Sequence, residues 1–67
     1  MSAGAIMRDL RGRRSQSEVA AGIGIKKSSY AMYERDERRP RDEVKRKIAK
    51  YFQKTEQEIF FADNEHI

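Results

Sequence analysis

The chain has no cysteine and no tryptophan, and it has a single proline among its 67 residues. Without cysteine there is neither a disulfide nor a thiolate ligand for a metal ion, and a reducing cytoplasm is the expected compartment. One proline argues against a strand-rich fold with many tight turns. No apolar run approaches the roughly 20 residues that a membrane-spanning helix needs, and no secretory signal is visible. We therefore expect a cytoplasmic protein with no membrane partner.

Basic and acidic residues are unevenly distributed along the chain. Residues 8–50 hold 14 Lys and Arg against 7 Asp and Glu, whereas residues 51–67 hold one Lys against four acids. A basic segment attracts a polyanion, because each lysine or arginine that neutralises a phosphate releases a counterion. With 39% charged residues, however, the same charge could simply solvate a small helical protein. Charge alone therefore favours neither interpretation.

Apolar residues recur at the three- and four-residue spacing of α-helices, which predicts an all-α fold of five short helices. Ile6, Met7 and Leu10 mark a first helix that ends near Gly12. A second helix is expected from Gln16 to about Ile23, and it carries one apolar face.

Capping signals indicate where several of these helices begin and end. Ser15 with Glu18 three residues later has the pattern of a capping box, which opens the second helix. Gly24 supplies the left-handed conformation that ends it. Thr55 with Glu58 is a second capping box and opens a final turn or two.

A third helix is expected from Lys27 to about Arg35, with Tyr30 and Tyr33 facing inward. The positions on its other side are Lys27, Ser28, Ala31 and Met32. A fourth helix, capped by Asp42, has its apolar residues at spacings of four, seven and eight. These residues are Val44, Ile48, Tyr51 and Phe52.

The second and third helices are joined by a short glycine-containing turn, and the third presents small polar and basic residues outward, which is typical of a helix-turn-helix. The segments "SQSEVAAGIGIKKSSYAMYERDERRP" and "DEVKRKIAKYFQKTEQEIFF" resemble the small helix-turn-helix regulators related to lambdoid phage repressors and Cro proteins, the XRE family. The resemblance covers roughly residues 7–61. It implies one lambda-repressor-like DNA-binding domain over residues 1–67, with a core of about 5–61 and a short tail, 62–67.

The start of the third helix is the part that reaches base edges in such a motif. Lysine can donate to guanine, serine can donate or accept, and methionine can contact a thymine methyl group. The base-reading candidates are Lys26, Lys27, Ser28 and Met32. The candidates for phosphate contacts are Gln16, Ser29, Arg35, Arg38 and Arg39, with Arg41 at the edge of the same basic run. Lys26 and Ser29 could serve either bases or phosphates, and Met32 could instead pack into the core.

The resemblance also implies a structural ion pair between Arg11 and Glu34, since the family typically pairs a glutamate there with an arginine of the first helix. Two positions depart from the family pattern. Arg14 replaces the apolar residue that normally precedes the N-cap, which weakens the expected hydrophobic staple, so the pattern alone does not define where the first helix lies. Asp36 stands where the family usually has glycine, and aspartate tolerates the left-handed conformation only at a cost.

The function expected from these features is sequence-specific binding of double-stranded DNA by a transcriptional regulator that has no effector domain. So small a module makes few base contacts, so we expect a homodimer on a two-fold operator with half-sites about 34–36 Å apart. The apolar end of the last helix could be the self-association patch or could complete the core. That end consists of Ile59, Phe60 and Phe61.

Two other classes of function compete with this one. The same fold could serve as a protein-interaction module, antitoxin-like or as a co-regulator, with its basic face incidental. An enzyme has little support, because His66 has no partner at metal-ligand spacing and no Ser/Cys–His pairing is suggested. We expect no catalytic residue, metal, cofactor or small-molecule ligand.

Overall fold

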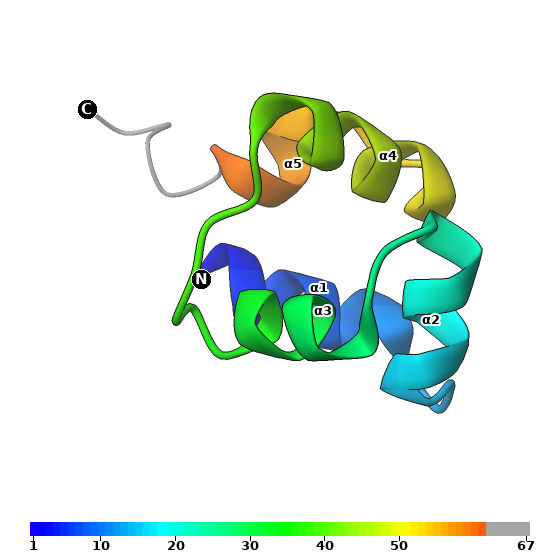
Figure 1. Ribbon diagram of the computed structural model, residues 1–67. Helices are drawn as coiled ribbons and strands as arrows, with labels where there is room; N and C mark the ends of the chain where they lie inside the picture. The colour runs from blue at the N-terminus through cyan, green and yellow to red at the C-terminus, as the bar shows by residue number, and fades with distance from the viewer. Residues whose placement is uncertain (62–67) are drawn as a thin grey trace.

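The computed structural model describes residues 1–61, which form five helices and no strand (Figure 1). These are α1 (Ala3–Arg11), α2 (Gln16–Ile23), α3 (Lys27–Glu34), α4 (Asp42–Phe52) and α5 (Glu56–Phe60). The all-α fold of five short helices is therefore confirmed. The tail at 62–67, which includes His66, lies outside the described residues.

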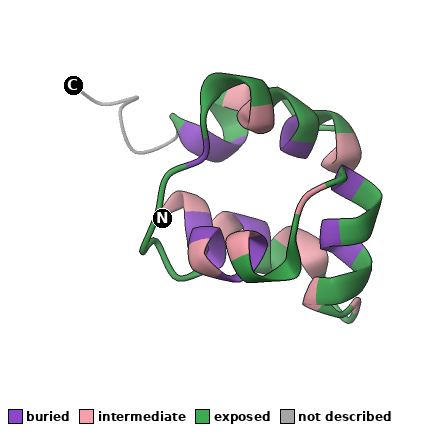
Figure 2. Ribbon diagram, in the orientation of Figure 1, coloured by how far each residue is buried: buried purple, intermediate pink, exposed green. Residues whose placement is uncertain are grey.

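The five helices enclose one core. In Figure 1, α1 and α3 lie side by side below, α4 and α5 lie above, and α2 joins the two halves at one end. The five largest fully buried side chains come from five different helices, and Figure 2 shows buried positions on every helix. These side chains are Met7, Val19, Tyr30, Ile48 and Ile59. No single pair of helices could bury this set, so each helix depends on the others for its stability.

The apolar end of α5 completes this core. Ile59 and Phe60 are 1% and 6% exposed, whereas Phe61 is 39% exposed. Of the two roles that the sequence left open for these residues, the first two positions therefore have the core role. Phe61 remains exposed, and Lys45 Nζ lies 4.9 Å from the centre of its ring.

The caps largely follow the sequence prediction. Thr55 with Glu58 forms a complete capping box. At α2 only half of the predicted box forms: Ser15 Oγ accepts a hydrogen bond from the Glu18 N–H at 3.0 Å, and the described residues show no return bond to the Glu18 carboxylate. At α4 the prediction was wrong by one residue, because Arg41 holds the cap position and Asp42 is the first helical residue. A carboxylate in the first turn still interacts favourably with the helix dipole, which explains why the sequence pattern was misleading there.

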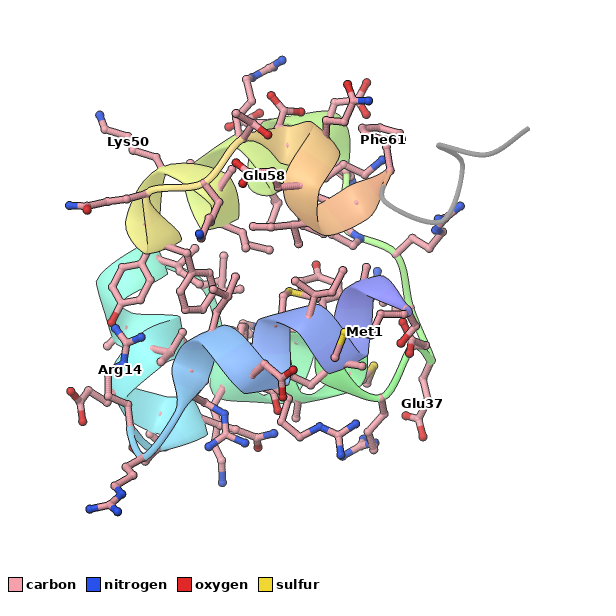
Figure 3. The ribbon with its side chains drawn as sticks, turned by 180° about the vertical axis from the view of Figure 1, so that it is seen from behind. Met1, Arg14, Glu37, Lys50, Glu58 and Phe61 are labelled. Carbon is pink, nitrogen blue, oxygen red and sulfur yellow. The ribbon has the colours of Figure 1, made fainter. Side chains whose placement is uncertain are left out.

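Arg14 fixes the C-terminal end of α1. Its Nη2 donates to the Leu10 carbonyl at 2.7 Å, and its Nε donates to the Arg11 carbonyl at 3.1 Å. Its Nη1 donates to the Tyr51 hydroxyl at 3.1 Å, and its guanidinium lies over the rings of Tyr51 and Phe52. Figure 3 shows Arg14 from behind, at this junction. This arginine replaces the apolar staple with hydrogen bonds and ring contacts, which define the placement that the sequence pattern left open.

The other end of α1 is held by Asp36, two residues after the end of α3. Asp36 has φ 58°, the left-handed conformation that the sequence suggested. Its Oδ1 accepts a hydrogen bond from the Gly4 N–H at 3.0 Å. Gly4 is buried, and a Cβ atom there would collide with the Glu34 carbonyl oxygen. Glycine thus allows α1 to approach the end of α3 closely.

None of the described helices has the length and apolar character to cross a membrane.

Candidate nucleic-acid interface

The start of α3 presents three polar side chains to solvent. Lys26, Lys27 and Ser28 are exposed, and within residues 1–61 their side chains make no hydrogen bond or ion pair. Met32, one turn further along, is half-buried. Tyr30 and Tyr33 are buried, as predicted. The candidate base-reading residues therefore lie on the outer side of a helix that its tyrosines hold to the core.

The sequence pattern assigned one residue to the wrong face of α3. Ala31 is only 9% exposed, although the helical pattern placed it with the outward residues. Ala31 is accordingly not a candidate contact residue.

The loop between α3 and α4 carries three exposed arginines next to α3. Arg38, Arg39 and Arg41 are exposed, and their side chains have no hydrogen-bond or ion-pair partner in the described part of the chain. Together with Ser29 of α3 they line one hollow of about 310 Å³. Tyr33 and Val44 complete its lining. The hollow thus combines a serine hydroxyl of α3 with three unpaired guanidinium groups, which are suitable donors for phosphate oxygens.

Arg35, another candidate phosphate contact, already has a partner. Its Nη2 lies 3.1 Å from Glu37 Oε1, and both side chains are more than half exposed. The hydrogen bond from Arg35 lowers the pKa of the Glu37 carboxyl. Glu37 projects outward from the loop in Figure 3. An ion pair this exposed is weak, so it can exchange for a phosphate contact.

Glu34 is the one buried charged side chain among the described residues, and it is 3% exposed. The Arg11–Glu34 pair that the family resemblance implied is present and bidentate. Arg11 Nε donates to Oε2 at 2.7 Å, and Arg11 Nη2 donates to Oε1 at 3.1 Å. Burial alone would raise the pKa of Glu34, but hydrogen bonds from Arg11 and Gln16 outweigh it and the net shift is downward. The carboxylate is therefore ionised at neutral pH and cannot serve as a proton donor.

Gln16, a candidate phosphate contact, belongs to the same cluster. Its Nε2 donates to Glu34 Oε1 at 3.0 Å. Sequence reasoning missed this bond, because the two residues are 18 positions apart and no periodic pattern relates them. The Tyr30 hydroxyl is buried nearby and has no hydrogen-bond partner of good geometry within residues 1–61. Burial, followed by the neighbouring Glu34, raises the pKa of Tyr30 above its ordinary value. These side chains join α1, α2 and α3 at one buried carboxylate.

The described residues contain no group of three His, Cys, Asp or Glu side chains that could hold a metal ion. The candidate site consists of the exposed start of α3 and the arginine-lined hollow.

Comparison with known proteins identifies the arrangement. A helix-turn-helix family model matches residues 7–59, most of the chain. The chain belongs to the helix-turn-helix family. It is also similar to the transcriptional repressor RstR of the cryptic phage CTXphi of Vibrio cholerae, with 44% identity over 48 residues. The match covers 69% of this helix-turn-helix chain but 43% of the repressor, so the chain corresponds to less than half of that relative. No solved structure matches the chain.

Proposed function

We propose that this helix-turn-helix protein binds double-stranded DNA in a sequence-specific manner and regulates transcription. One observation carries the proposal: exposed Lys27 and Ser28 at the start of α3 lie next to a hollow lined by unpaired arginines. A helix of this family inserts its N-terminal residues into the major groove, while neighbouring cations hold the sugar-phosphate backbone. The similarity to a phage transcriptional repressor supports the same function.

The side chains divide into two groups by chemistry. Lys27 can donate to guanine O6 and N7, and Ser28 can donate to or accept from a base edge. Met32 offers an apolar contact to a thymine methyl group, and Lys26 adds a second cation beside the groove. The second group would contact phosphates and consists of Gln16, Ser29, Arg35, Arg38 and Arg39. Arg41 lines the same hollow as Ser29, Arg38 and Arg39. This division predicts that the first group sets sequence preference and the second group sets affinity.

The protein is further proposed to act as a homodimer on a two-fold operator. One copy presents few base-reading side chains, so two half-sites one helical turn apart, about 34–36 Å, would supply the missing specificity. Because Ile59 and Phe60 are buried, self-association through the end of α5 would depend on Phe61.

Selection of bound sequences from a random duplex library tests the proposal. Enrichment of one sequence with two-fold symmetry is the expected result, and the affinity for it should fall steeply with salt, by a slope of about −0.9 per phosphate neutralised. A library that remains random after repeated selection, or an affinity that does not respond to salt, would favour a protein-interaction module.

A further inference from the structure

Gln16 is held by the nitrogen of its side-chain amide. It is the first residue of α2, and its Nε2 lies 3.0 Å from Glu34 Oε1. An ionised carboxylate can only accept hydrogen bonds, so the atom that faces Glu34 must be the amide nitrogen and not the amide oxygen. The carboxylate itself is immobilised, because it is 3% exposed and Arg11 holds both of its oxygens. The orientation of the Gln16 amide is therefore fixed before any partner arrives.

This orientation matters for a contact with DNA. A phosphate oxygen accepts hydrogen bonds, so a glutamine must approach it with an N–H and not with its carbonyl oxygen. Gln16 uses one N–H on Glu34 and retains the second. A glutamine that was free to rotate would present nitrogen and oxygen equally and would lose side-chain entropy on binding.

We propose that Glu34 is a positioning residue for DNA binding, which orients the Gln16 amide so that its second N–H is available to a phosphate. The inference rests on the proposed DNA-binding function. Because Glu34 is the last residue of α3 and Gln16 is the first residue of α2, one carboxylate sets this phosphate contact relative to the reading helix. Arg11 is part of the support, and its Nη1 also donates to the Arg14 carbonyl at 2.8 Å.

A double-mutant cycle tests the proposal. The affinity for a fluorescent random-sequence duplex of about 20 base pairs, two helical turns, is measured by anisotropy at low salt. Glu34→Gln should weaken binding about fivefold when Gln16 is present, and less than twofold in the Gln16→Ala background. Gln57 is an exposed glutamine whose side chain makes no described hydrogen bond, so Gln57→Ala is the matched control background. There the fivefold loss should persist.

An equal loss in all three backgrounds would overturn the proposal and leave Glu34 with a purely structural role. If the unmodified protein binds no duplex even at low salt, the proposed function itself fails and this inference fails with it. The two failures are thus distinguishable by the unmodified protein alone.

A measurement on the unmodified protein covers the case in which Glu34→Gln does not fold. Side-chain amide signals of Gln16, Gln53 and Gln57 are followed by NMR during addition of the same duplex. Before addition, the Gln16 amide protons should exchange with water more slowly than those of the two exposed glutamines, and on addition they should shift most. Unprotected Gln16 protons, or shifts no larger than those of Gln53 and Gln57, would contradict the proposal.

Discussion

Single residues decide how tightly the recognition motif is held, and Arg14 is the clearest case. Its three hydrogen bonds satisfy two carbonyl groups at the end of α1 and reach the Tyr51 hydroxyl of α4. Carbonyl groups at a helix end have no partner within the helix, so an arginine that binds two of them acts as a C-cap. Its position over Tyr51 and Phe52 adds cation–π attraction. Glu34 has a similar linking role at the buried junction of α1, α2 and α3.

Arg14→Ala should lower the free energy of unfolding by about 1–2 kcal/mol, because it removes hydrogen bonds from a half-buried site. Urea unfolding measures the loss. Arg13→Ala is the matched control, since Arg13 is exposed and makes no described side-chain contact, and it should change stability by less than about 0.5 kcal/mol. Equal effects of the two substitutions would refute the capping role of Arg14.

Glu34 should make stability depend on acid pH. Its pKa in the folded protein lies below its ordinary value of 4.5, so the unfolded chain binds this proton first as pH falls. The contribution of Glu34 to the free energy of unfolding is therefore complete above about pH 4.5. It should be lost as pH falls from there through the pKa of Glu34 in the folded protein. Urea unfolding of the unmodified protein at a series of pH values measures the decrease. Glu34→Gln should flatten it, whereas Glu58→Gln, at an exposed cap, should retain most of it.

At the scale of helices, the sequence predicted what depends on local signals. The five helices, the Thr55–Glu58 capping box and the Gly24 helix end follow from periodicity and capping, which involve neighbours within four residues. Contacts between distant parts of the chain were missed. Arg14 meets Tyr51 across 37 positions, and Asp36 meets Gly4 across 32. Such pairs depend on how helices pack, and no spacing rule reveals them. The Arg11–Glu34 pair was expected because the family resemblance supplied it.

The junction between α1 and the end of α3 gives a prediction at this scale. Asp36→Gly removes the cost of a left-handed aspartate but also loses its bond to the Gly4 N–H, so the effects should cancel to within about 0.5 kcal/mol. Asp36→Ala keeps the strained φ and loses the bond, so it should cost about 1–2 kcal/mol. Thermal and urea unfolding compare the two variants. Equal stabilities for glycine and alanine would show that φ at this position is not strained.

For the whole molecule, the central claim is that one surface joins base reading with phosphate binding. Ser29 of α3 and Arg38, Arg39 and Arg41 line the same hollow, and the exposed start of α3 lies beside it. The net charge of +4 favours the approach of a polyanion, but it carries no sequence information. The discriminating quantity is therefore the ratio of affinities for the selected operator and a scrambled duplex.

Measurement of this ratio for the unmodified protein, Lys27→Ala and Arg38→Ala tests the claim most directly. Lys27→Ala should reduce the ratio about tenfold, because it removes a base contact worth roughly 1–3 kcal/mol of discrimination. Arg38→Ala should weaken binding to both duplexes equally and reduce the salt slope by about one. If Lys27→Ala leaves the ratio unchanged while the operator is still bound, α3 is not the reading helix and the account is wrong.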